Sequence, residues 1–224
     1  MQHRRESGIL LHPTSLPGPG GIGSLGTEAR RFVDFLAAAG QSLWQVLPLG
    51  PTGSGHSPYS CYSAFAGNPL LIDLETIADE GDIAREDLRP GFPDAVVDFP
   101  RVERFKNGLL RQCAARFFAD GASKRKDEFL RYCDTTFWLG EFALFMAMKE
   151  AHGGKSWLHW PREIACREPA VLSQYGESLK EAINCQKYIQ WQFSRQWLAL
   201  KQYANSRGIK IIGDIPIFVA FDSA

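Results

Sequence analysis

The sequence lacks a surplus of charge of either sign and lacks long apolar runs. Its 224 residues include 25 Lys and Arg and 25 Asp and Glu, so the formal net charge is zero. Proteins that bind nucleic acid or anionic membranes usually carry a basic surplus, so we expect neither partner. No uncharged apolar stretch approaches the ~20 residues that cross a bilayer. The N-terminal residues also lack the long apolar region of a signal peptide.

Paired cysteines and metal-ligand spacings are lacking too. The cysteines stand singly, with no Cys-x-x-Cys pair, at Cys61, Cys113, Cys133, Cys166 and Cys185. An odd number of scattered cysteines favours reduced thiols in a cytoplasmic protein over a disulfide framework. The histidines show no spacing typical of zinc ligands. We therefore expect no metal and no organic cofactor.

A strand, a helix and a second strand are predicted within the first fifty residues. Residues 8–12 form a short apolar run, and Thr27 can cap a helix whose apolar side chains share one face. Gly40 is placed to end that helix, and residues 42–49 form a second apolar strand. This order implies parallel strands joined by a right-handed crossover.

The segment 50–68 is a long loop rich in Gly, Ser and aromatic residues. A loop of this length is usually functional or disordered, and its aromatic content favours function. Pro58 restricts Ser57 to extended conformations, so the Ser57 hydroxyl and the Tyr59 ring are held rigidly. Such a pair suits a sugar, because a sugar offers hydroxyl groups at its edge and apolar faces. A structural loop with Tyr59 in the core is an equal alternative. Residues 70–73 are predicted to resume extended chain.

Helices are predicted from about residue 76 onward. Apolar periodicity indicates helices over 102–118 and 138–154. Pro161 is well placed at the start of a further helix. A long helix is predicted over about 177–206 and ends before Gly208. Three tryptophans occur at helical spacings and are expected in the core rather than on a sugar-binding surface. They are Trp138, Trp191 and Trp197.

Asp214 is the first polar side chain after a third apolar strand at 209–212. A carboxylate at the C-terminal end of a parallel strand is typical of an active site, whereas a helix cap or an Arg partner is the alternative. Asp222 and Ser223 are expected in a turn or cap. The strand and helix order fits an α/β barrel or a doubly wound sheet, and both gather functional groups at this end of the strands.

A glycine motif offers a competing function. Gly18, Gly20 and Gly23 match the dinucleotide pattern G-x-G-x-x-G. That pattern requires glycines directly after a strand, so that a helix N-terminus meets the phosphates. Here residues 12–17 separate the strand from the glycines, which favours turn formation over nucleotide binding.

Four stretches together resemble the 4-α-glucanotransferases called amylomaltases or disproportionating enzymes. They are GILLHPTSLPGPGGIGSLG, FVDFLAAAGQSLWQVLPLGPTG, HSPYSCYSAFAGNPLLIDLE and QWLALKQYANSRGIKIIGDIPIFVAFDSA. The resemblance implies an α/β fold, a (β/α)8 TIM barrel of the α-amylase clan with helical insertions, with only the first three barrel strands in this chain. The corresponding division is 1–75 for two strands and the substrate-binding loop, 76–176 for a helical inserted subdomain, and 177–224 for the long helix and third strand.

The resemblance also implies an activity. Family members transfer α-1,4-glucan segments between malto-oligosaccharides by a retaining double displacement. Matched residue by residue, Asp214 would help to shape the donor sugar site, and Ser57 and Tyr59 would contact the glucan. No catalytic residue is assigned, because the nucleophile and the acid/base are expected beyond residue 224.

We therefore expect the 224 residues alone to be inactive, and we expect an open sheet with uncovered apolar surface. Glucose release or chain lengthening from maltotriose by these residues alone would contradict the first expectation. The alternative function is a non-catalytic remnant that binds malto-oligosaccharides. The sequence does not predict an oligomeric state.

Overall fold

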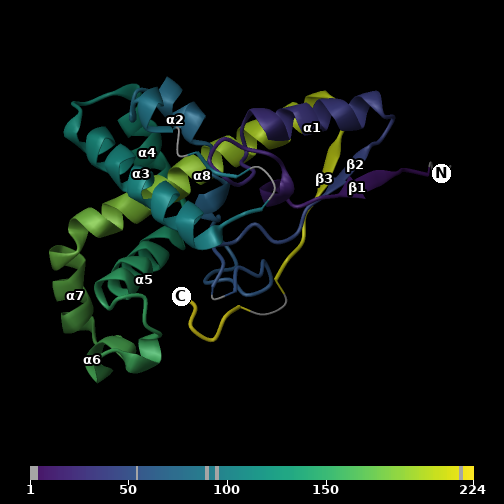
Figure 1. Cartoon of the computed structure of the whole chain (residues 1–224). Helices are drawn as coiled ribbons and strands as arrows, with labels where there is room; N and C mark the ends of the chain where they lie inside the picture. Colours follow the sequence, from purple (N-terminus) through teal and green to yellow (C-terminus); the bar gives the residue numbers. More distant parts are fainter. Residues whose placement is uncertain (1–4, 54, 89–90, 94–95, 217–218) are drawn as a thin grey trace.

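A parallel three-stranded sheet forms one end of the protein. The computed structural model describes residues 5–53, 55–88, 91–93, 96–216 and 219–224. The strands lie in the order β1 (Gly8–Leu10), β2 (Leu43–Gln45) and β3 (Lys210–Ile212), as Figure 1 shows. The three predicted strands are confirmed, although each is shorter than its apolar run.

Helices make up most of the remaining described chain. They are α1 (Thr27–Ala38), α2 (Leu74–Asp79), α3 (Phe99–Ala119), α4 (Lys124–Thr135), α5 (Leu139–Ala151), α6 (Arg162–Ala165), α7 (Pro169–Ser178) and α8 (Lys180–Ser206). Short 3-10 helices occur at η1 (Pro13–Ser15), η2 (Pro69–Leu71), η3 (Arg85–Leu88) and η4 (Trp157–His159). In Figure 1, α1 and α8 lie side by side next to the sheet, and α3 to α7 gather at the other end of α8.

One face of the sheet packs against α1 and α8. Trp44 in the central strand is fully buried. The apolar cluster around it includes Val33, Leu36, Leu200, Ala204 and Ile209. On the opposite face Leu10 and Ile212 remain 54% and 41% exposed. The expectation of uncovered apolar surface is confirmed at these two residues.

The ends of α1 follow from two glycines. Gly26, not Thr27 as predicted, is the residue before the helix. A side chain has no room there, since a Cβ on Gly26 would lie 2.4 Å from Cγ of Asp73. Glu28 in the first turn complements the positive end of the helix dipole. Gly40 adopts a φ of +69°, the left-handed conformation expected just past a helix end.

The prediction of extended chain at 70–73 is confirmed for Ile72 and Asp73 but is wrong for Leu70 and Leu71, which lie in a helical turn. Asn68 accepts a hydrogen bond from the Leu70 amide at 2.9 Å and starts η2 at Pro69. Asp73 accepts one from the Thr76 amide at 3.0 Å and starts α2. The short apolar run therefore begins as a helical turn and becomes extended only at Ile72 and Asp73, just before α2.

The predicted long helix over 177–206 is interrupted at Leu179. This residue leaves helical geometry, ends α7 and precedes α8, which then runs unbroken to Ser206. Gly208 follows with a φ of +76°, as predicted for a helix end. The helices predicted over 102–118 and 138–154 correspond to α3 and α5, and Pro161 precedes the short α6.

A second core fills the helical end. It is built around Phe117 on α3 with Tyr188 and Trp191 on α8. The expected burial of Trp191 is confirmed, and Trp197 packs against the sheet cluster. Trp138 is only half-buried and stacks on the exposed Phe65 ring at 6.3 Å, so the prediction of a core role for it is wrong.

Lys106 on α3 is a buried cation within this core. Its Nζ donates hydrogen bonds to the carbonyls of Leu70 and Ile72, each at 2.6 Å. These contacts satisfy the carbonyls of the turn around η2 and fix it to α3. Burial lowers the pKa of Lys106 from 10.5 to about 8, because the charged ammonium loses its hydration.

We expect the free energy of unfolding to rise with pH, relative to a Lys106→Met variant, between pH values of about 8 and 10.5. In that window the unfolded chain binds the lysine proton and the folded protein does not, so raising the pH favours the folded state. The full difference is about 3 kcal/mol, at ~1.4 kcal/mol for each pKa unit. Urea unfolding of the wild type and of Lys106→Met across this pH range measures the difference. Subtracting the two free energies of unfolding removes the titration of the Cys and Tyr residues that both proteins share. A pH-independent difference would contradict the prediction.

Candidate functional site

The C-terminal ends of the three strands lie at one edge of the sheet. His12 follows β1, and its Nε2 lies 3.3 Å from the carbonyl oxygen of Pro48, which follows β2. Its Nδ1 lies 2.6 Å from Oγ1 of Thr14. Burial lowers the pKa of His12, so the neutral ring can donate to Pro48 and accept from Thr14. His12 thus fastens two strand ends together, a contact that the sequence does not reveal.

Tyr59 and Asp214 meet at this edge. The Tyr59 hydroxyl donates a hydrogen bond to Oδ2 of Asp214 at 2.8 Å, and the Ile215 amide donates to Oδ1 at 2.8 Å. Accepting this bond makes Asp214 the main cause of a raised pKa at Tyr59. Each carboxylate oxygen keeps further acceptor capacity, so Asp214 can also accept from a ligand hydroxyl.

The structure bears on the non-functional alternatives for these two residues. Tyr59 is 47% exposed, so the alternative that places it in the core is wrong. Asp214 follows β3 and does not cap a helix among the described residues. The loop of 50–68 and the segment after β3, 155 residues apart in sequence, therefore share one exposed pair of polar groups.

Ser57 lies in the same turn as Tyr59. Its hydroxyl oxygen accepts from the Tyr59 amide at 3.3 Å, and its carbonyl oxygen accepts from the Ser60 amide at 3.0 Å. Within the described part of the chain, the hydrogen bonds of Ser57 stay inside this turn. Ser57 is exposed beside the Tyr59–Asp214 pair without touching Asp214.

The loop of 50–68 is tied down at several points. An antiparallel bridge joins Thr52 to Cys61. His56, with a φ of +54°, stacks on Phe99 of α3 at 4.3 Å, and its Nδ1 lies 3.4 Å from Oε1 of Glu103. The turn that carries Ser57 and Tyr59 is therefore held between the sheet and α3.

The segment 219–224 runs beside this loop. Cys61 forms a parallel bridge with Val219, and the Ala220 amide donates to the Cys61 carbonyl at 2.8 Å. Asp222 lies in a turn, as expected, but it also forms an ion pair with Lys149 of α5. The sequence alone does not identify Lys149 as part of this contact, since its partner lies 73 residues away.

Close backbone packing explains two glycines of the motif, Gly18 and Gly23, whereas a Cβ on Gly20 would meet nothing within 4 Å. A Cβ on Gly23 would lie 2.0 Å from the Pro13 carbonyl oxygen, and one on Gly18 would lie 2.4 Å from that of Ile22. α1 begins only at Thr27, four residues after the last glycine of the motif. These contacts support the expected turn rather than a nucleotide site.

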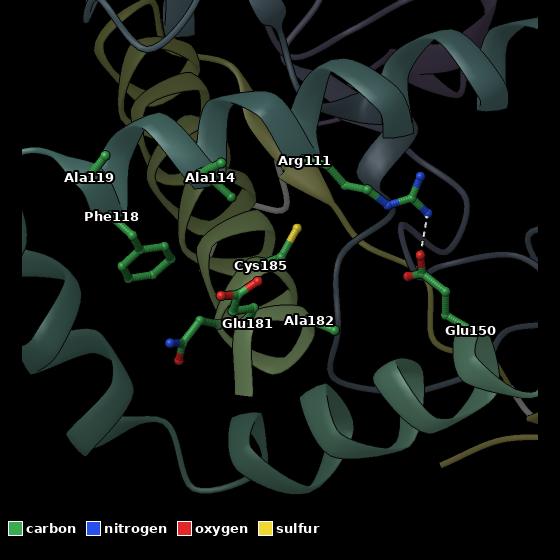
Figure 2. A pocket seen from close by; sticks show the side chains of 10 residues that line it. Arg111, Ala114, Phe118, Ala119, Glu150, Glu181, Ala182 and Cys185 are labelled. Atoms are coloured by element: carbon green, nitrogen blue, oxygen red, sulfur yellow. Dashed lines mark ion pairs between the residues drawn. The ribbon is translucent and has the colours of Figure 1, made fainter. Parts of the chain in front are cut away.

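Figure 2 shows a hollow of about 470 Å³ that lies apart from the predicted site. It opens between α3, α5 and α8 and has a floor of alanines beside Phe118. Arg111 of α3 and Glu150 of α5 form an ion pair of 2.8 Å at one side. None of Ser57, Tyr59 and Asp214 lines it.

The described residues offer neither a cluster of metal ligands nor a membrane-spanning helix. No group of three or more His, Cys, Asp and Glu side chains there could hold a metal ion. None of the helices described is long and apolar enough to cross a membrane.

Comparisons with known proteins agree with the resemblance. The model of a family described as 4-alpha-glucanotransferase matches residues 11–224. Relatives with that name from Synechocystis sp. and Thermus thermophilus are each 48% identical over the whole of this chain. A solved amylomaltase from Streptococcus agalactiae, in complex with acarbose, is 40% identical over 98% of this chain with a TM-score of 0.94. The chain spans 45% of the length of each of these three proteins.

Proposed function

This chain belongs to the 4-alpha-glucanotransferase family, and from that premise we propose that its protein transfers α-1,4-glucan segments between malto-oligosaccharides. The observation that carries the proposal is 48% identity to relatives of that name across the whole chain. The exposed Tyr59–Asp214 pair at the strand ends supports it, because hydroxyls and carboxylates recognise sugar hydroxyls.

The reaction we propose is a retaining double displacement. One carboxylate attacks the anomeric carbon and breaks the glycosidic bond, while a carboxylic acid protonates the leaving oxygen. The 4-hydroxyl of another glucan then displaces the first carboxylate and gives its proton to the acid/base. Asp214 would accept hydroxyl groups of the donor sugar, and Ser57 and Tyr59 would line the glucan path. We assign neither the nucleophile nor the acid/base to this chain.

We further propose the architecture that this chemistry uses in the family. The parallel sheet would be the first three strands of a (β/α)8 barrel, with 76–176 as a helical insertion between 1–75 and 177–224. The scattered single cysteines favour the cytoplasm. The partner would be a malto-oligosaccharide or another α-1,4-glucan, with acarbose as a probe because a solved relative contains it.

The test is an assay of the native protein, as its source produces it, with maltotriose as the only substrate. We expect glucose together with malto-oligosaccharides longer than maltotriose, and competition by acarbose. Glucose and maltose without longer products would indicate hydrolysis instead of transfer. Glucan binding without any product would replace the proposal with the non-catalytic alternative.

A further inference from the structure

Lys149 on α5 is a buried lysine, which is uncommon unless the charge is paired. Its side chain is 6% exposed. The ammonium donates to Oδ2 of Asp222 and lies 3.4 Å from the Lys155 carbonyl oxygen. It also lies 4.7 Å from the centre of the Tyr62 ring, within the range of a cation–π contact.

Two of the contacts of Lys149, Tyr62 and Asp222, belong to the segments that carry the proposed site. Tyr62 follows Tyr59 by three residues in the loop, and Asp222 follows Asp214 by eight. The two segments are bonded to each other beside Lys149, where the Ala224 amide donates to the Tyr62 carbonyl at 2.9 Å. One ammonium therefore contacts both segments near the place where they pair.

The helical end supplies a second anchor at Asp222. The Trp157 amide donates to Oδ1 of Asp222 at 3.2 Å, and its indole N–H donates to the Phe221 carbonyl at 3.1 Å. Both carboxylate oxygens of Asp222 thus accept hydrogen bonds, one from Lys149 near the end of α5 and one from Trp157 in η4. These contacts fix Phe221 and Asp222 to the helical part of the chain.

We propose that Lys149, through Asp222 and Tyr62, is a positioning residue that holds Tyr59 and Asp214 in register for the glucan. The inference rests on the proposed function. Tyr59 and Asp214 approach the site from different segments, and their contact persists only if both segments are held. Misplacement of binding groups by ~1 Å can lower a catalytic rate by about 100-fold, so an anchor outside the site can control activity.

The experiment is a double-mutant cycle in the native protein. Lys149→Met keeps the apolar stem and removes the charge, and Asp222→Asn removes the carboxylate. We expect each to lower kcat/KM for transfer from maltotriose by about tenfold, and the double variant by about tenfold rather than about 100-fold, because the residues act as one contact. kcat and KM are measured separately, well below the unfolding temperature and per folded molecule.

The matched control is Glu150→Gln. Glu150 neighbours Lys149 on α5 but pairs with Arg111 of α3 at one side of the hollow in Figure 2. Its removal should leave kcat/KM within about twofold, since exposed ion pairs contribute little.

Three outcomes would overturn the inference. Wild-type kcat and KM in folded Lys149→Met, with only the unfolding temperature lowered, would make Lys149 purely structural. Additive losses in the double variant would show that the two residues act separately. An inactive wild-type protein would end the proposed function and this inference with it. If Lys149→Met does not fold, the less buried Asp222→Asn decides between the same kinetic results.

Discussion

Replacing Asp214 by Asn is expected to lower kcat/KM for glucan transfer by the native protein by on the order of 10²–10³. The carboxylate accepts from the Tyr59 hydroxyl through one oxygen and from the Ile215 amide through the other. Asn has one acceptor oxygen, so one of these bonds is lost. The negative charge is lost too, and it would stabilise the positive charge that develops on the donor sugar in the transition state. Initial rates with maltotriose measure the effect.

The chain offers a matched control for Asp214. Asp34 on α1 also accepts from a tyrosine hydroxyl, that of Tyr203, at 2.7 and 2.8 Å. This pair is exposed and lies on helices rather than at the strand ends, so Asp34→Asn should leave transfer within about twofold of wild type. Tyr59→Phe, which keeps the ring and the carboxylate, should give an intermediate loss of about tenfold. Equal rates for Asp214→Asn and Asp34→Asn would remove Asp214 from the proposed site.

Replacing Arg125 by Met is expected to lower the free energy of unfolding by about 3–5 kcal/mol. The guanidinium donates to both oxygens of Asp82, at 2.9 and 2.6 Å, and the Asp82 side chain is 2% exposed. Tyr188 donates its hydroxyl to the same carboxylate at 2.6 Å, and burial together with Asp82 raises the pKa of Tyr188. Removing Arg125 leaves a buried carboxylate without its countercharge. Urea unfolding measures the loss.

The comparison for Arg125 is another ion pair near the same helices. Arg85 pairs with Asp79, and both side chains are more than half exposed. Arg85→Met should therefore lower the free energy of unfolding by less than about 1 kcal/mol. A similar loss of unfolding free energy in Arg125→Met and Arg85→Met would mean that the burial of Asp82 does not determine the size of the loss. Transfer by folded Arg125→Met should stay near the wild-type rate, since Arg125 lies on α4 and pairs with Asp82 and Glu80 rather than with a residue of the proposed site.

The elements that the sequence predicts well are those with a strong local pattern. The strands, α1, α3, α5 and the end of α8 follow from apolar periodicity and from glycines such as Gly40. α4 is mostly polar, with only a short apolar stripe of Phe129, Tyr132 and Cys133, and is not among the helices that the sequence predicts. The turns at Asn68 and Asp73 were missed because capping by one side chain overrode a short apolar run.

The candidate site is predictable only in part, because its groups come from distant segments. Asp214 stands out by its position after a strand. Tyr59 stands out because the rigid Pro58 lies between it and Ser57. Their hydrogen bond is a tertiary contact, which local patterns cannot reveal. Lys149 gives a weak signal, a charged residue within the apolar helix 138–154, but nothing nearby identifies Asp222 as its partner.

Gln190 and Gln196 show the same limit. Gln190 accepts from the Gly67 amide at 2.7 Å and donates to its carbonyl at 2.9 Å. Gln196 makes the corresponding pair with Asp73, at 2.7 and 3.0 Å. Each glutamine completes the backbone hydrogen bonding of a non-helical segment. The sequence indicates these contacts only by placing a glutamine at a position of α8 that is buried.

α8 joins the two cores through one continuous rod. Leu200 and Ala204 belong to the cluster against the sheet, and Tyr188 and Trp191 belong to the cluster among the helices. Phe193 packs against both clusters. We therefore expect the two ends to unfold together, as one cooperative unit. The amide hydrogens in the middle of α8 would then exchange with solvent only when the whole molecule opens.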